Sequence, residues 1–197
     1  MGSVFAQQDA QSTWLKGDID RVVVHLPFAS SVKVQPSNEP TILLRYRTEG
    51  EYQNTLLLVR KLRERTLYLK ENRSPDFTAH QDKLSAHKVI ASSFLLSVPE
   101  DVVLEFNITQ ADVRIESPLP HLDLFLGEGS VTIASPKVFG LVRTLKGTIF
   151  APQEKNPSVV LPWSASKNIP KPLDEQNLIL QSREGKIFVQ STGNVDL

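Results

Sequence analysis

The sequence contains no cysteine among its 197 residues, so disulfide bonds and thiolate metal sites are excluded. Its 22 acidic and 22 basic residues give a formal net charge of zero, which argues against a dedicated nucleic-acid binder and against docking on acidic membranes by bulk charge. No apolar run approaches the roughly 20 residues that a transmembrane helix requires. Hydrophobic residues nevertheless make up 40% of the chain, which is enough for the core of one domain.

Motifs of known catalytic chemistry are also missing. The sequence has no glycine-rich phosphate loop, no Gly-x-Ser-x-Gly elbow and no His-Glu-x-x-His zinc motif. It lacks the acidic calcium-binding nonapeptide and the regular hexapeptide of known β-helical repeats. We therefore predict a protein that is not an enzyme and that holds no metal or other cofactor.

What the sequence does contain is a repeat of 18 residues between Leu104 and Ala151, whose register returns at Leu178 after a step of 38. Within each repeat, apolar residues alternate with mostly polar ones, which is typical of strands buried on one face. The matching positions form five columns: Leu104, Leu122, Gly140, Leu178; Phe106, Leu124, Val142, Leu180; Ile108, Leu126, Thr144, Ser182; Val113, Val131, Ile149, Ile187; and Ile115, Ile133, Ala151, Val189.

Turn residues repeat with the same period. A further column, Ala111, Gly129, Gly147 and Gly185, separates the two strands of each repeat, and glycine there permits a tight corner with positive φ. Proline follows each of the first two repeats and stops the strand. Repeats that turn and bury matching residues stack best on one another. We therefore predict an all-β fold whose C-terminal half, residues 101–197, is a short parallel β-solenoid or β-roll of about 18 residues per turn.

The N-terminal half, residues 13–100, also reads as successive strands, but without the 18-residue register. We expect an irregular, partly antiparallel β-sheet that is continuous with the solenoid half and covers its first turn, so that 13–197 is a single β domain. Residues 1–12 are expected to be a leader and disordered N-terminus. The small side chains at 3–6 resemble a signal-peptide remnant, which predicts export to the periplasm or the cell surface.

Two polar stretches of the N-terminal half are candidate sites that we consider weaker. A hairpin is predicted from strands at 55–62 and 66–70, and basic residues surround its turn together with Tyr68: Arg60, Lys61, Arg63, Arg65, Lys70 and Arg73. Because strand alternation sends these side chains to different faces and acidic residues interrupt them, we predict a solvated hairpin rather than an anion-binding stripe. His80, Asp82 and His87 match no established metal-ligand spacing, so we predict a polar loop there.

Outward positions of the solenoid half supply the other candidates. Glu105 and Asp123 share a column, about 5 Å apart, a separation that suits a retaining glycosidase. Two solvated carboxylates are the simpler interpretation, and a carbohydrate-active enzyme using this pair is the alternative function.

Phe150 and Phe188 face outward on the last turns, beside a proline-rich insertion at 152–176 that contains Trp163. Within the insertion, Val159 to Leu161 can still pair briefly as a strand. Long excursions from a rigid scaffold often bind ligands, so we predict that Trp163, Phe150 and Phe188 form a ligand-binding surface. The competing interpretation is that the insertion merely covers these side chains.

Several segments resemble a known group of proteins. They are similar to an uncharacterised family of bacterial, flavobacterial-type, adhesin-like β-solenoid domains, related to the auto-transporter adhesin head domain group. The segments are 26–30, 39–42, 48–53, 83–91 and 98–100. The resemblance covers nearly the whole chain and implies export and a β-helical fold, but it supplies no catalytic or binding residues.

Together these observations predict a non-enzymatic, extracytoplasmic binding or structural module of the bacterial cell envelope. Its expected partner is an envelope polysaccharide or a surface protein, with no nucleic acid and no transmembrane segment. A self-associating structural domain is a further alternative.

Overall fold

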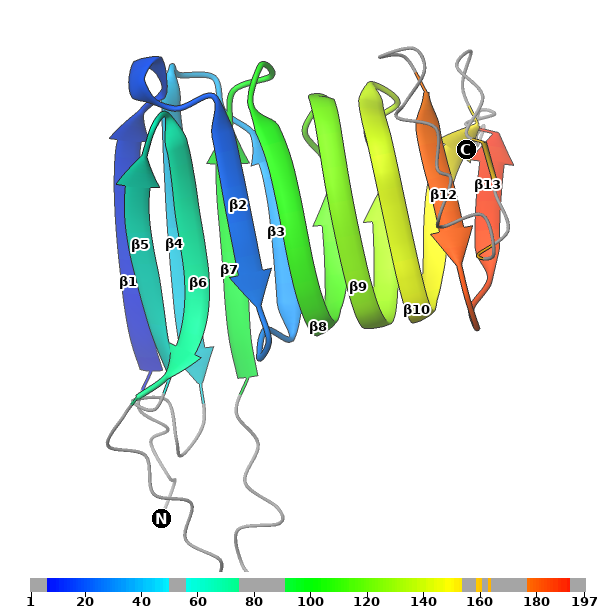
Figure 1. Cartoon of the computed structure of the whole chain (residues 1–197), viewed down its shortest axis with the longest axis horizontal. Helices are drawn as coiled ribbons and strands as arrows, with labels where there is room; N and C mark the ends of the chain where they lie inside the picture. Colours follow the sequence, from blue (N-terminus) through cyan, green and yellow to red (C-terminus); the bar gives the residue numbers. More distant parts are fainter. Residues whose placement is uncertain are drawn as a thin grey trace, which may run out of the picture.

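The computed structural model describes residues 7–49, 56–74, 91–153, 159–160, 163 and 177–191. Apart from the 3-10 helix η1 (Lys16–Asp18) and a 3-10 position at Trp163, its elements are strands of one 13-stranded mixed sheet (Figure 1). The strands are β1 Gln7–Leu15, β2 Arg21–Leu26, β3 Ser31–Pro36, β4 Thr41–Glu49, β5 Leu56–Arg63, β6 Thr66–Arg73, β7 Ala91–Val98, β8 Val103–Ile115, β9 Leu119–Ile133, β10 Val138–Gln153, β11 Val159–Val160, β12 Leu178–Ser182 and β13 Ile187–Ser191. The prediction of an all-β fold is confirmed.

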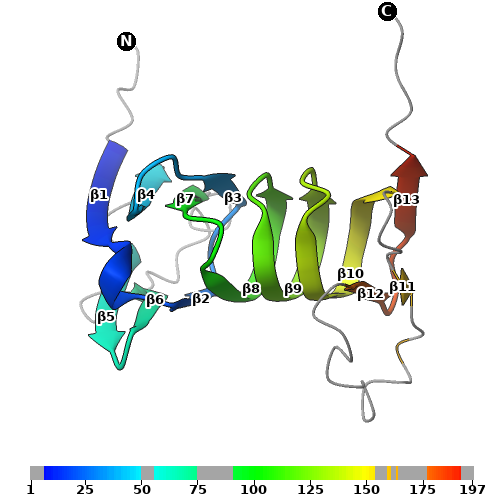
Figure 2. The ribbon, with the colours of Figure 1, turned by 90° about the horizontal axis from the view of Figure 1, so that it is seen from above.

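The sheet is folded into two layers, because β8, β9 and β10 each bend in the middle and contribute to both (Figure 2). The first half of β8 pairs with β2, and its second half pairs with β3. One layer therefore holds β5, β6 and β2, and the other holds β1, β4, β7 and β3. The buried residues of both layers form one hydrophobic core between them, which includes Leu104, Val113 and Ile149.

The pairing of the long strands follows the repeat in the sequence. β8 and β9 are parallel, with Leu104 opposite Leu122 and Ile115 opposite Ile133, an offset of 18 residues. The same offset joins β9 to β10, and β10 then pairs with β12 and β13 at an offset of 38. Residues predicted to share a column are therefore neighbours across the sheet.

The glycine column differs from its prediction. Among the glycines of this column, only Gly129 has a positive φ, 124°. The other described glycine with a positive φ is Gly140, at 121°, which belongs to another column. A Cβ on Gly129 would overlap the carbonyl oxygen of Ala111 on the preceding strand, and a Cβ on Gly185 would overlap that of Gly147. The column is thus needed chiefly for the close stacking of successive corners.

The N-terminal half is partly antiparallel, as expected. β1 pairs antiparallel with β4, β4 with β7, and β5 with β6. The β5–β6 hairpin turns at Glu64 and Arg65, whose positive φ values suit a two-residue loop of type I′. The strands of this half that meet β8, which are β2 and β3, run parallel to it and continue the ladder of the long strands.

Two predicted boundaries are wrong. Residues 7–12 are not a disordered terminus, because they belong to β1, where Trp14 packs against the core and fixes the strand beside β4. Residues 1–6 lie outside the described residues. The insertion does not begin at Pro152, because Pro152 and Gln153 still pair with β13. The short strand expected at Val159 and Val160 is confirmed as β11, which pairs with β12.

Candidate functional site

An exposed aromatic pair lies on the outer face of the last strands. Phe150 of β10 and Phe188 of β13 are direct partners in the parallel ladder, and their rings stack with centroids 5.3 Å apart and planes inclined by 11°. They are 37% and 41% exposed. Two stacked rings held by strand pairing form an apolar platform whose side chains are ordered before a ligand binds.

The platform stands out from the rest of its own column. The same outward column carries Arg114 on β8 and Thr132 on β9, so it is polar until it reaches Phe150. Polar residues are usual in a column that faces solvent, whereas two exposed phenylalanines side by side are unusual there. The column prediction thus placed both residues correctly on the surface and next to one another.

Trp163, the third residue of the predicted site, is half-buried. Within the described part of the chain, no ring contact joins it to Phe150 or Phe188. Residues 154–158, 161–162 and 164–176 of the insertion lie outside the described residues. On the other layer, both faces of β12 are buried: Ile179, in the outward column, is only 6% exposed. On the last strands, the outward side chain of Ile179 is therefore buried in one layer, whereas those of Phe150 and Phe188 in the other layer are exposed to solvent.

The two carboxylates of the predicted glycosidase pair are neighbours but have other partners. Glu105 and Asp123 lie opposite one another on β8 and β9. Glu105 forms an ion pair with Arg21 of β2, and Asp123 forms one with Arg143 of β10, at 3.3 Å. Both carboxylates are partly exposed. This arrangement is that of alternating surface ion pairs along an outer strand face, the simpler of the two interpretations.

A buried polar cluster that the sequence analysis missed joins the two layers near the N-terminal end. Glu71 of β6, 1% exposed, accepts hydrogen bonds from the Tyr46 hydroxyl of β4 at 2.7 Å and from the Ser92 hydroxyl of β7 at 2.6 Å. Its second oxygen accepts the backbone N–H of Phe28 at 2.8 Å. The alternation of Leu67, Leu69 and Glu71 on the inward face of β6 was the signal that could have revealed it.

We expect Tyr46 to make stability depend on alkaline pH. Burial raises the pKa of Tyr46, and the adjacent Glu71 carboxylate raises it further. An acid with a raised pKa in the folded state stabilises the fold below its unfolded pKa, about 10, and this contribution is lost as the pH rises above that value. Urea unfolding should therefore show stability falling more steeply above pH 10 in the wild-type protein than in Tyr46→Phe. Equal slopes would contradict this assignment.

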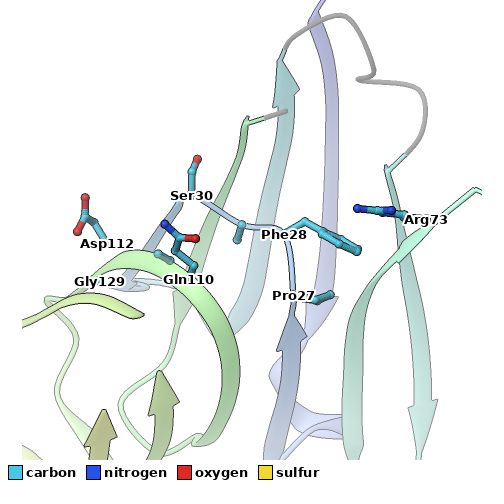
Figure 3. A pocket seen from close by; sticks show the side chains of 9 residues that line it. Pro27, Phe28, Ser30, Arg73, Gln110, Asp112 and Gly129 are labelled. Carbon is cyan, nitrogen blue, oxygen red and sulfur yellow. The ribbon is translucent and has the colours of Figure 1, made fainter. Parts of the chain in front are cut away.

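A hollow of about 480 Å³ lies beside this cluster, where the turn between β2 and β3 faces the corners of β8 and β9 (Figure 3). Its walls include the Phe28 ring, with the Arg73 guanidinium 4.8 Å from the ring centroid, and the Asp112 side chain. Asp112 accepts a hydrogen bond from Ser130 at 2.7 Å, and Ser30 donates one to the carbonyl of Ser92 at 2.9 Å. Polar groups of the wall are thus already engaged with the protein itself, which makes the hollow a weaker candidate than the aromatic pair.

The described part of the chain meets neither the requirements of a metal site nor those of a membrane-spanning helix. There, no three His, Asp or Glu side chains gather in a way that could hold a metal ion. His80, Asp82 and His87 lie outside the described residues. Among the residues that the structure describes, no helix is long and apolar enough to cross a membrane.

Comparison with known proteins identifies the fold. No protein-family model matches the chain, and no curated protein matches it in sequence. Its structure is similar to that of a Clostridium sporogenes protein named for a proposed role in cell adhesion: the TM-score is 0.56 at 9% identity, covering 95% of this chain and 100% of that one. A Bacteroides fragilis protein named as a proposed adhesin matches with a TM-score of 0.35 at 9% identity, covering 93% and 97%. At this identity the first similarity shows a shared all-β fold.

Proposed function

We propose that the protein is a non-enzymatic, adhesin-like binding module of the bacterial cell envelope, exported to the periplasm or the cell surface. The C-terminal half acts in this proposal as a short β-solenoid of about 18 residues per turn, and the N-terminal half caps it. The 18-residue offsets between the long strands support the solenoid. The adhesion-related name of the Clostridium sporogenes protein, which shares the fold, is consistent with a binding role.

The observation that carries the proposal is the exposed stack of Phe150 and Phe188. Exposed aromatic rings are frequent anchors of recognition because they bury a large area at a small entropic cost. Trp163 is proposed to extend the same surface. An envelope polysaccharide fits the platform, because the apolar C–H faces of sugar rings stack on aromatic rings; a surface protein is the other candidate partner.

The test is co-sedimentation of the purified protein with envelope fractions, before and after enzymatic removal of polysaccharide. We expect the double variant Phe150→Ser/Phe188→Ser to bind at least about tenfold more weakly, since loss of two anchors costs about 1.4 kcal/mol or more. Leu15→Ser is the matched control, because Leu15 is 68% exposed at the opposite end of the molecule. A Trp163→Ala variant tests the extended surface.

Three outcomes bear on the proposal. Loss of binding on polysaccharide removal, and in the phenylalanine variant alone, supports glycan recognition at this surface. Binding that survives polysaccharide removal but needs both phenylalanines identifies a protein partner. If the double variant binds as tightly as the wild type, recognition by this surface is wrong. It is also wrong if analytical ultracentrifugation shows that the pair instead mediates dimers, and in that case the self-associating alternative gains support.

A further inference from the structure

The outer face of the β5–β6 hairpin gathers cations that the sequence appeared to scatter. Leu67, Leu69 and Glu71 point into the core, so Tyr68 and Lys70 point outward. In the antiparallel register, Lys61 lies opposite Tyr68 and Val59 lies opposite Lys70. Lys61 and Arg63, two residues apart on β5, therefore share the outward face with Tyr68 and Lys70. The prediction that these basic residues are divided between faces holds for Arg60 of β5 and Arg73 of β6, which are on the other face of the hairpin.

The acidic residues that were expected to interrupt the stripe do not lie on this face. Glu71 is buried in the hydrogen-bonded cluster, and Glu64 is in the hairpin turn. On the outward positions of β5, β6 and the adjoining β2, the described residues include no Asp or Glu. The chain as a whole is neutral, so this excess of positive charge is local.

Two arginines at the border of this face already form ion pairs with carboxylates of the protein. Arg21 of β2 is held by Glu105. Arg65 forms a bidentate pair with Asp20, at 2.5 and 2.8 Å, and the hydrogen bond from this guanidinium lowers the pKa of Asp20. Lys61, Arg63 and Lys70, by contrast, form no ion pair with any residue in the described ranges.

Tyr68 lies at the centre of these cations and is 42% exposed. Lys61 is its cross-strand partner, Lys70 is two positions along its own strand, and Val23 of β2 is its partner on the other side. In a sheet these neighbours are about 4.8 Å away across strands and about 6.7 Å away along a strand. Leu57 and Val59, both nearly half exposed, extend the apolar part of the face.

From this arrangement we propose that the outer face of β5 and β6 binds an acidic polysaccharide. Lys61, Arg63 and Lys70 pair with its carboxylates, and the Tyr68 ring stacks against the apolar face of a sugar ring. Because β5 and β6 are paired along their length, these side chains are attached to an ordered backbone before the polymer binds, which lowers the entropic cost of binding. The site is distinct from the phenylalanine pair, so it goes beyond the function proposed above.

Other polyanions fit this face less well. Proteins that bind single-stranded nucleic acid stack successive bases on several aromatic side chains, whereas this face has one exposed ring. Anionic membranes are bound through apolar side chains that insert to a depth of about 5–10 Å. Leu57 and Val59 are short side chains held within a paired strand and cannot reach that far.

The test measures binding of the full chain to immobilised polygalacturonate, a carboxylated polysaccharide, with neutral dextran as the uncharged comparison. We expect binding to polygalacturonate only, weakening as salt rises to about 0.5 M. The variant Lys61→Gln/Arg63→Gln/Lys70→Gln should bind at least about tenfold more weakly. Tyr68→Ala should lose about fivefold. All four substitutions are at exposed positions, so unchanged thermal unfolding will show that the fold is retained.

Arg60→Gln is the matched control, because it removes one exposed cation from the same strand but from the opposite face. It should leave binding to polygalacturonate unchanged. Phe188→Ser should also leave it unchanged, because Phe188 belongs to the surface of the function proposed above, and the two proposals can therefore fail separately. The inference is overturned if the wild type does not bind polygalacturonate at about 0.15 M salt, or if Arg60→Gln weakens binding as much as Lys61→Gln. Binding to a single-stranded oligonucleotide or to phosphatidylglycerol vesicles in place of polygalacturonate also overturns it.

Discussion

Gly129→Ala should be strongly destabilising, lowering the free energy of unfolding by about 3 kcal/mol or more. Gly129 has a φ of 124°, a conformation that alanine adopts only under strain. The added Cβ would also overlap the Ala111 carbonyl oxygen, which is backbone of a packed neighbouring strand and cannot move aside. Urea unfolding followed by circular dichroism measures the change.

Gly17→Ala is the matched control for this prediction. A Cβ on Gly17 would have no atom within 4 Å apart from those of its chain neighbours, and the position is exposed on η1. The free energy of unfolding should therefore change by less than about 0.5 kcal/mol. Equal stabilities of the two alanine variants would show that the corner between the two halves of β9 can relax, and that the close stacking of corners does not hold the layers in place.

Glu71→Leu should have an effect of similar size, at least about 3 kcal/mol. Leucine has nearly the same volume but accepts no hydrogen bond, so the buried hydroxyls of Tyr46 and Ser92 and the N–H of Phe28 would lose their common acceptor. Each buried donor left without a partner costs about 1–3 kcal/mol. The same unfolding experiment tests this, with stability measured at neutral pH.

Two companion variants make the Glu71 result interpretable. Tyr46→Phe removes one donor and leaves the acceptor in place, so it should cost only about 1 kcal/mol. Glu128→Leu makes the same change of side chain at an exposed position and should be nearly neutral. If Glu71→Leu proved as stable as Glu128→Leu, the three hydrogen bonds would contribute no net stability to the contact between the layers.

The C-terminal half of the fold could be predicted in detail because it repeats. A parallel strand stacked on its own copy must bury equivalent residues, so the 18-residue columns fix which residues are partners in β8, β9 and β10. The N-terminal half has no such internal reference. Nothing local in β3 indicates that it pairs with both β7 and β8, since these partners are distant in sequence and their choice depends on the completed core.

The candidate sites show the same division. Phe150 and Phe188 were found because a column assigns both their face and their neighbour. The cations of the β5–β6 hairpin were divided between faces because alternation was applied to each strand without the cross-strand register, and because Glu71 was counted as a surface charge. Only the register shows that Lys61 and Lys70 surround the same tyrosine.

The two-layer arrangement has a further consequence for how the proposed surfaces act together. Tyr68 faces outward from the layer that contains β2 and β6, whereas Phe150 faces outward from the layer that contains β3 and β7. The hydrophobic core lies between them, so one straight polymer chain cannot lie on both surfaces at once. If both proposed surfaces bind polymers, one molecule would therefore bind two separate polymer chains at once and link them, which neither surface could do alone.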